Sequence, residues 1–506
     1  MAHSRNPSLY QINTRICLHE LADKLGRPVT LDDIPDAELD RFLGLGFDWI
    51  WLLGVWQTGP AGRQVSLTQP QWRKEYEVTL LDFTDADVSG SPFAIHDYAL
   101  HSDFGTLDSL PRFRERLQQR GLRLLLDFVP NHVALDHPWG KSHPEYFIEG
   151  TETDLAHIPQ NYCRVEGADR WLILAHGRDP YFPGWPDTLQ LNYRHPGLRA
   201  AMINELRQMA DLCDGVRCDM AMLILPDVFQ RTWGDASIPH DGAAPVDVPF
   251  WPEAIDSVHA EHPDFVFMAE VYWDLEWTLQ QQGFDYTYDK RLYDRLHTRD
   301  AGGVRGHLGA DLDFQYKSVR FLENHDEPRA ANAFAWPVHQ AAAIVTFLIP
   351  GLRFFHEGQF EGRRSRVSMH LSRRPDEVID LEASAFYERL LNCLKRPDLR
   401  VGRWRLLDCK PAWDGNPTWW FYLAFAWEGD GQTSVIVVNY GPNQGQCRIR
   451  LPFTNLTGKK VLLIDLMRPS SYERDGKDLA ANGLFIDLPA WGYNVFDWSV
   501  TPNARG

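Results

Sequence analysis

LRLLLDFVPNH, residues 122–132, is an apolar run that ends in charged and polar side chains. Three further segments have the same form: DGVRCDM (214–220), DFVFMAE (264–270) and VRFLENHD (319–326). A short run of Leu, Val, Ile and Phe is typical of a strand that is buried on both faces. Because a charge at the end of such a strand is costly to bury, four such endings indicate that these carboxylates have a role there. The pattern predicts one parallel barrel with a carboxylate-rich site at its C-terminal face.

Apolar strands alternate with amphipathic helices along the first 400 residues. We expect strands at 8–14, 47–55, 122–129, 215–218, 265–269, 284–286, 319–322 and 352–355. We expect helices at 34–45, 104–120, 198–212, 275–282, 291–297 and 340–348. This alternation is typical of βαβ units and a parallel sheet. Eight strands are the number that a closed (β/α)8 barrel needs, so the predicted fold class is α/β with a TIM barrel.

Two regions break this rhythm. Residues 134–194 are rich in His, Pro, Gly, Trp and Asp and are too long for an ordinary connection, so we expect a small subdomain inserted after the third strand. After about residue 400, short β-type runs at 419–427, 433–439, 447–451 and 461–465 replace the helical pattern. We therefore predict a catalytic barrel over 1–400, an inserted subdomain at 134–194 and a C-terminal antiparallel β-sandwich over 401–506.

Composition limits the kinds of binding partner and the cellular compartment that we expect for this protein. The chain has 506 residues and a net charge of −18, which disfavours nucleic acid and anionic membranes as partners. Its seven Cys form no CxxC or disulfide framework, and MAHSRNPSLYQINTR at the start has no apolar signal region. No run approaches about 18 apolar residues, so we expect a cytoplasmic protein that does not span a membrane. No feature of the sequence indicates an oligomeric state.

Arg217 and Asp219 stand two residues apart on one predicted strand, so both side chains point into the barrel mouth. A neighbouring guanidinium keeps a carboxylate ionised and oriented, as a nucleophile at a sugar carbon must be. Glu270 ends an almost wholly apolar strand, where burial raises a carboxyl pKa and suits a general acid that later acts as base. Taken singly, each of these groups also fits a structural ion pair.

Other polar side chains lie at the same predicted edge of the barrel. Asp326 could stabilise positive charge on a sugar ring, and His325 and His132 could donate to sugar hydroxyls. We expect Asp127 to be a buried partner of Arg217. Asn131 could hold the inserted subdomain in place or bind an ion. Two carboxylates in different environments plus a third are what glycoside hydrolysis needs.

Together the segments DFVPNH, GVRCDMA, FMAE and ENHD resemble the four ordered sequence regions of the α-amylase family of glycoside hydrolases. The flanking segments SPFAIHDY, WPDTLQLNY and PGLRFFHEGQ also resemble segments of that family. The resemblance covers residues 8 to 400, and a C-terminal sandwich is another trait of the family.

The resemblance implies a retaining mechanism on α-glucosidic bonds of α-glucans or oligosaccharides. By position, Asp219 is the nucleophile, Glu270 the acid/base and Asp326 the transition-state stabiliser. It also implies that Arg217, His132 and His325 bind the sugar at the bond-breaking subsite. No cofactor is required for this chemistry, although many members bind calcium through the residue that matches Asn131.

The sequence departs from the family pattern on the acceptor side. Met222 and Leu223 stand where many amylases have Lys and His that contact the leaving sugar, so this side is expected to be apolar. Phe93 replaces a Tyr that stacks on the bound sugar. Tyr272 and Trp273 are expected either to form an aromatic acceptor platform or to pack against the inserted subdomain.

Three functions follow from these observations. The first is a cytoplasmic retaining α-glucosidase-type hydrolase, which the three carboxylates favour. The second is a transglycosylase of the same family that passes a glucosyl or maltosyl unit to another sugar, since an apolar acceptor side could exclude water. The third, a non-catalytic sugar-binding homologue, is disfavoured because all three carboxylates and Arg217 are present.

Overall fold

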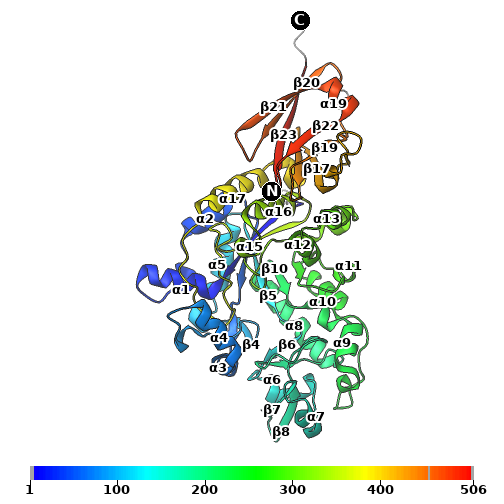
Figure 1. Ribbon diagram of the computed structural model, residues 1–506. Helices are drawn as coiled ribbons and strands as arrows, with labels where there is room; N and C mark the ends of the chain where they lie inside the picture. The colour runs from blue at the N-terminus through cyan, green and yellow to red at the C-terminus, as the bar shows by residue number, and fades with distance from the viewer. Residues whose placement is uncertain (1–4, 454–455, 503–506) are drawn as a thin grey trace.

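Eight parallel strands close into a barrel in the computed structural model, which describes residues 5–453 and 456–502 (Figure 1). Around the barrel the strands follow the order β1-β14-β13-β12-β11-β10-β5-β2. The strands are β1 (Ser8–Asn13), β2 (Trp49–Leu53), β5 (Arg123–Phe128), β10 (Gly215–Cys218), β11 (Val266–Ala269), β12 (Tyr286–Tyr288), β13 (Ser318–Arg320) and β14 (Leu352–His356). The predicted (β/α)8 barrel is confirmed.

The barrel strands form where the sequence is apolar on both faces. Every residue of β2 (WIWLL) is buried, which accounts for its lack of polar alternation. β10 is also buried throughout, and its one charged residue is Arg217. One predicted strand was misplaced: 284–286 becomes β12 at Tyr286–Tyr288. Phe284 is fully buried against Trp251 just before that strand, so its apolar character reflects core packing and not the ladder.

Helices surround the barrel and connect its strands (Figure 1). They are α1 (Thr14–Leu25), α2 (Asp36–Leu45), α5 (Ser109–Gln118), α8 (Pro196–Leu212), α9 (Pro226–Trp233), α10 (Phe250–His259), α11 (Glu276–Gln281), α12 (Lys290–His297), α13 (Ala301–Leu308), α14 (Leu312–Tyr316), α15 (Ala330–Ala333), α16 (Trp336–Leu348), α17 (Leu381–Leu394) and α18 (Pro397–Val401). The sequence pattern did not indicate α1, because only its first turns are buried and its outer end is exposed. No helix in the described part of the chain is both long and apolar enough to cross a bilayer.

The segment after β5 forms an insertion outside the barrel that contains two antiparallel pairs of short strands. β6 (His132–Ala134) pairs with β9 (Thr188–Gln190), and β7 (Tyr162–Glu166) pairs with β8 (Trp171–Ala175). Short helices α6 (Trp139–Ser142) and α7 (Glu152–His157) lie between them. This insertion projects from the end of the molecule opposite the C-terminal domain (Figure 1).

A second insertion, which no sequence pattern predicts, lies between β2 and α5. It contains β3 (Trp56–Thr58), α3 (Pro60–Thr68), α4 (Pro70–Thr79) and β4 (Ile95–Leu100). Tyr76, Leu80 and Val88 pack with Leu371 from the loop after β14 into a separate apolar cluster. We call α3, α4 and residues 363–374 the cap, because they form one packed unit beside the barrel mouth.

The C-terminal region is a sandwich of two antiparallel sheets, as predicted. One sheet has the order β15 (Arg403–Leu406), β17 (Tyr422–Gly429), β18 (Gln432–Asn439), β23 (Tyr493–Pro502), β20 (Lys459–Asp465), β21 (Ser470–Asp475). The other has the order β16 (Cys409–Lys410), β19 (Gly445–Ile449), β22 (Leu484–Leu488), and α19 (Gly476–Asn482) precedes β22. Trp427 is fully buried, and its indole donates a hydrogen bond to the carbonyl of Leu348 at the end of α16. This contact fixes the sandwich to the barrel.

Candidate active site

A cavity with a volume of about 330 Å³ opens at the C-terminal ends of the barrel strands. That volume lies at the lower end of the range for small-molecule sites, which is ~300–1,000 Å³. The cavity is lined by Trp72, Ser91, Phe93, His132, Trp185, Asp187, Thr188, Arg217, Asp219, Met220, Glu270, Tyr272, His325, Asp326 and His370. The three predicted catalytic carboxylates therefore face one space.

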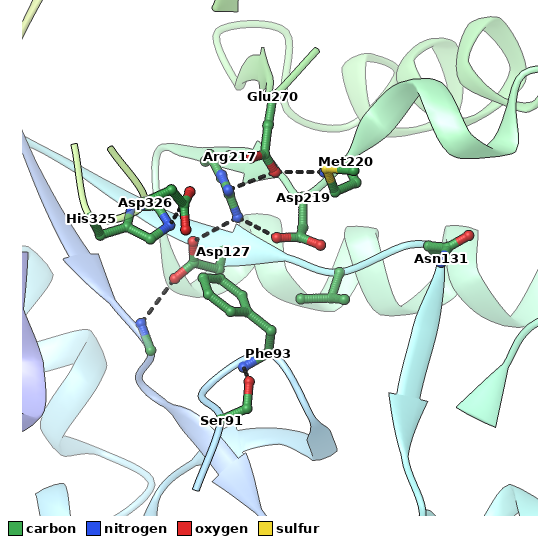
Figure 2. A network of polar contacts seen from close by, with 12 residues as sticks. Ser91, Phe93, Asp127, Asn131, Arg217, Asp219, Met220, Glu270, His325 and Asp326 are labelled. Carbon is green, nitrogen blue, oxygen red and sulfur yellow. Dashed lines mark hydrogen bonds and ion pairs between the residues drawn. The ribbon is translucent and has the colours of Figure 1, made fainter. Parts of the chain in front are cut away.

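Arg217 is the centre of the polar network at this cavity (Figure 2). Its guanidinium donates at 2.7 Å to Asp219 and at 2.7 Å to Glu270, and it lies 3.7 Å from Asp127. Parallel pairing of β10 with β5 sets Arg217 beside Asp127 in register. The Arg217 side chain is 1% exposed, so the surrounding carboxylates compensate a charge that water cannot reach.

Aromatic rings enclose the same guanidinium. Trp51, Phe93 and Tyr288 have ring centroids 5.5, 5.3 and 6.0 Å from its central carbon. Rings at this range attract a cation and exclude water. Arg217 is thus held in one orientation, and so are the two carboxylates that it binds.

Glu270 follows β11 and is held from three directions. One carboxylate oxygen accepts from Arg217 and from the backbone N–H of Met220 at 2.8 Å, and the other accepts from the Tyr272 hydroxyl at 2.8 Å. Burial raises the pKa of Glu270, and repulsion from Asp219 and Asp326 adds to the shift while Arg217 opposes it. A carboxyl with a raised pKa can hold a proton for transfer to a leaving group.

Asp219 follows β10, with 9% of its side chain exposed toward the cavity. Burial raises the pKa of Asp219 as well, and the ion pair with Arg217 counteracts that shift. The next residue, Met220, has φ 41°, a left-handed conformation that is rare for a side chain of this kind. This strained turn aims the Met220 N–H at Glu270, which links the positions of the two carboxylates.

Asp326 and His325 follow β13 on another side of the cavity. The His325 Nε2 lies 3.1 Å from Asp326, whose side chain is 44% exposed to the cavity. The Gln11 amide donates to Nδ1 of His325 at 2.9 Å, which places the imidazole proton on Nε2. Burial lowers the pKa of His325 to about 3, so the ring is neutral near neutral pH and can donate one hydrogen bond.

The predicted sugar-contacting residues Phe93 and His132 both line the cavity. The Phe93 ring lies 5.7 Å from that of His325, and the His132 ring lies 5.0 Å from Trp185. Burial lowers the pKa of His132 to about 3, so this ring is also a neutral hydrogen-bonding group. The cavity thus combines apolar faces with neutral donors, as sugar binding requires.

Asp127 does not line the cavity, and its contacts are structural. It accepts from the backbone N–H of Gly54 at 2.9 Å and stands behind Arg217. Burial raises the pKa of Asp127 to about 7, with Arg217 opposing the shift. These contacts fit the supporting role expected of it.

Asn131 is occupied by a protein partner. Its side-chain oxygen accepts from Nε2 of Gln190 at 3.0 Å, and its backbone carbonyl accepts from the same amide at 2.9 Å. Calcium takes about 6–8 oxygen ligands, and an amide N–H group cannot be one of them. Within the described residues no three or more His, Cys, Asp or Glu gather as metal ligands. The residues around Asn131 therefore do not fit calcium, and they fit the other prediction, which is anchoring of the insertion.

Two acceptor-side expectations need correction. Met222 is fully buried in the barrel core and does not line the cavity, and Leu223 is 3% exposed. Both belong to the 3-10 turn η5 (Ala221–Ile224), which folds inward after the strained Met220. Met220 takes the place expected of Met222. Of the predicted aromatic pair, Tyr272 lines the cavity, while Trp273 lies outside it with its ring 5.1 Å from Tyr181 of the insertion.

Trp72, His370 and Trp185 also line the cavity, although no sequence pattern predicts them there. Trp72 and His370 come from the two parts of the cap, and their rings stack at 4.3 Å. Ser66 fixes His370 through a 2.8 Å hydrogen bond to Nδ1. No strand pattern precedes Trp72 and His370, so only the tertiary contacts of the cap bring them to the site. Trp185 comes from the insertion, between β8 and β9.

Known proteins are similar to this chain in sequence and in fold. The model of the alpha-amylase catalytic domain family matches residues 37–297. The alpha-amylase MalA of Haloarcula japonica is 27% identical over 345 residues, which are 66% of this chain and 42% of that protein. A probable oligo-1,6-glucosidase of Bacillus subtilis is 28% identical over 371 residues, which are 64% of this chain and 60% of that protein. The chain spans about half the length of the curated relatives that it matches.

Solved structures share the fold along nearly the whole chain. The noncanonic maltogenic alpha-amylase AmyB of Thermotoga neapolitana has a TM-score of 0.67 at 18% identity, covering 97% of this chain and 98% of that one. The alpha-amylase of Geobacillus thermoleovorans has a TM-score of 0.65 at 17% identity, covering 99% of both chains. With more than half of the residues matched by the family model, this chain belongs to the α-amylase family.

Proposed function

We propose that the protein is a retaining α-glycoside hydrolase that acts on α-glucosidic bonds of α-glucans or oligosaccharides. The observation that carries this proposal is the binding of Asp219 and Glu270 to one guanidinium, each at 2.7 Å. Retaining enzymes hold their nucleophile and acid/base close together, at about 5–5.5 Å, whereas inverting enzymes leave room for a water between them. The family relatives named for amylase and glucosidase activity support the choice of substrate.

In the first step, a carboxylate oxygen of Asp219 attacks the anomeric carbon while Glu270 gives its proton to the departing glycosidic oxygen. A glycosyl ester on Asp219 results. In the second step, Glu270 takes a proton from water, and the water oxygen displaces Asp219 from the anomeric carbon. Asp326 faces the same cavity and stabilises the positive charge that develops on the ring in both steps.

Substitution of the nucleophile tests this assignment. Asp219→Asn should lower kcat on maltotriose and on an aryl α-glucoside by about 10³-fold or more, with the folded state intact. Asp227→Asn is a matched control, because that side chain is 72% exposed and lies outside the cavity. Proton NMR of early product should show the α-anomer first. Unchanged hydrolysis by Asp219→Asn, or early β-anomer, would contradict the proposal.

A second candidate is transfer of a glucosyl or maltosyl unit to another sugar. Apolar Met220 and the Tyr272 ring lie beside Glu270, where the acceptor must approach, and such a surface favours a sugar over water. A relative from Streptomyces coelicolor that is 26% identical over 260 residues is named alpha-1,4-glucan:maltose-1-phosphate maltosyltransferase 2. Incubation with concentrated maltotriose separates the two functions: longer products indicate transfer, and only shorter products indicate hydrolysis.

We further propose that the reaction needs no cofactor, that no calcium binds at Asn131 and that the protein works in the cytoplasm. The Gln190 amide at Asn131 and the seven free thiols support these points. Activity on maltotriose should be the same after prolonged treatment with a calcium chelator. The acidic net charge supports the absence of nucleic-acid and anionic-membrane partners.

A further inference from the structure

A second hollow lies beside α1, outside the catalytic cavity. Its volume is about 520 Å³, and it is bounded by α1, the start of α3, the strand end at Thr58 and the turn around His101. No residue that lines it also lines the catalytic cavity. We call this hollow the Arg15 cleft after the most buried charged residue in its wall.

Arg15 is 7% exposed, and its hydrogen bonds go only to neutral groups. Its guanidinium donates to the Ser89 hydroxyl at 2.9 Å, to the Gly90 carbonyl at 2.5 Å and to the Thr58 hydroxyl at 3.2 Å. Among the described residues, no carboxylate lies within ion-pair distance of it. The carboxylate of Asp103 attracts Arg15 electrostatically without a direct ion pair. A buried cation without a counter-ion in contact is costly.

Arg63 is a second cation in the wall of the cleft with the same kind of partners. Its guanidinium donates to the backbone carbonyls of Val88 at 2.7 Å and Asp85 at 3.0 Å. The nearby carboxylates are bound elsewhere: Asp85 accepts from Arg73, and Asp87 accepts from Arg373. Both arginines therefore remain available to an external anion.

The rest of the lining is consistent with an anionic occupant. Asp103 is the one acidic residue that lines the cleft, and its carboxylate is 82% exposed and lies 3.7 Å from His101. His19, His101 and the hydroxyls of Thr58 and Ser372 supply further polar contacts. The whole chain has a net charge of −18, but the lining of this cleft contains two arginines and one carboxylate. The cleft is therefore locally basic on an acidic protein.

We propose that the Arg15 cleft binds a small metabolite through an oxyanion, either a phosphate or a carboxylate. Guanidinium groups bind both kinds of oxyanion through paired N–H donors. The volume of about 520 Å³ admits an organic group attached to the anion, so the ligand class is a phosphorylated or carboxylated small molecule and not a bare ion alone.

The cleft is connected to the catalytic cavity through the chain. Arg15 holds Ser89 and Gly90, and the following residues Ser91 and Phe93 line the catalytic cavity. The Ser91 hydroxyl accepts from the backbone N–H of Phe93 at 3.2 Å, which makes this a short and tight turn. An anion bound to Arg15 would thus affect the position of residues 89–93, which carry the Phe93 ring into the catalytic cavity.

Isothermal titration calorimetry of the full chain with inorganic phosphate, glucose 6-phosphate and citrate tests the proposal, with glycerol as the neutral comparison. At least one of the three anions should bind, and the affinity should fall with added salt. Arg63→Gln and Arg15→Gln should each weaken that binding by about tenfold or more. Comparison of phosphate, glucose 6-phosphate and citrate distinguishes a phosphate site from a carboxylate site.

Arg27→Gln is the matched control, because that exposed arginine already pairs with Asp33. It should leave anion binding unchanged. Arg63 is exposed, so its substitution should not affect folding even where that of Arg15 does. The proposal is overturned when none of the three anions binds, or when Arg63→Gln binds them as the unsubstituted protein does. Because the measurement is of binding alone, its outcome does not depend on the proposed glycosidase activity.

Discussion

The hydroxyl of Tyr272 donates a hydrogen bond to Glu270 at 2.8 Å, from the side of the carboxylate that Arg217 leaves open. Both residues line the cavity, and the Tyr272 side chain follows the acid/base by two positions. A donor to the ionised carboxylate favours that form, so Tyr272 opposes the rise that burial causes in the pKa of Glu270. The Tyr272 hydroxyl therefore contributes to the pH at which Glu270 loses its proton, alongside burial and Arg217.

Removal of this donor should move the pH profile. In Tyr272→Phe the ionised form of Glu270 loses a hydrogen bond, so its pKa rises further. Because Glu270 must carry a proton in the first step, the alkaline limb of kcat/KM should shift to higher pH, by about one unit. Tyr193→Phe is the control, since that buried hydroxyl has no hydrogen-bond partner in the described structure. A shift of the alkaline limb to lower pH would refute the assignment.

Arg217→Lys tests whether one planar group must hold both carboxylates. An ammonium cannot reproduce the two 2.7 Å contacts of the guanidinium, so Asp219 and Glu270 should lose their relative position. We expect kcat/KM on maltotriose to fall by about 10²-fold or more.

The control for that variant is Arg114→Lys, which alters an arginine bound to Asp214 at the other end of β10. It should keep kcat/KM within a few-fold. Circular dichroism should show that both variants fold. Near-normal turnover by a folded Arg217→Lys protein would show that the shared guanidinium is dispensable.

Trp72→Ala tests the contribution of the cap to substrate binding. Trp72 stacks on His370 at 4.3 Å, and both side chains line the cavity. Loss of an aromatic wall should raise KM for maltooligosaccharides by up to about tenfold and leave kcat within a few-fold. Trp413→Ala is the control, because that indole is 55% exposed and outside the cavity. An unchanged KM would remove Trp72 from the binding surface.

Met222→Lys distinguishes a core residue from a cavity residue. Met222 is fully buried, so an ammonium there would lack water and a partner. We expect a loss of several kcal/mol in the free energy of unfolding, measured in urea. Met222→Leu conserves volume and should cost less than about 1.5 kcal/mol. A stable Met222→Lys protein would show that this side chain reaches the cavity and is not a core residue.

Much of the architecture could be predicted from local patterns. The apolar runs before Asp127, Asp219, Glu270 and Asp326 fix strands within a few residues, because a strand buried on both faces must be apolar throughout. The polar endings then identify the catalytic edge, since the carboxyl ends of parallel strands meet at one face. The exception is β12, where Phe284 is apolar because of side-chain packing and not because of strand pairing.

Residues of the loops could not be placed in this way. The resemblance to the family places Met222 on the acceptor side, three residues after the nucleophile. The left-handed Met220 turns the backbone and buries Met222 instead. Trp72 and His370 stand almost 300 positions apart, and only the packing of the cap brings them into contact. No periodic pattern in the sequence predicts the contact between Trp72 and His370.

The sequence by itself determined the barrel, the sandwich and the set of carboxylates, because each depends on patterns that repeat within a few residues. The tertiary structure decided how those groups act on one another: Arg217 joins Asp219 to Glu270, Gln190 occupies Asn131, and Arg15 has no carboxylate partner in the described residues. The physical reason is that charge interactions and enclosure depend on distances in space, and loops between the strands set those distances.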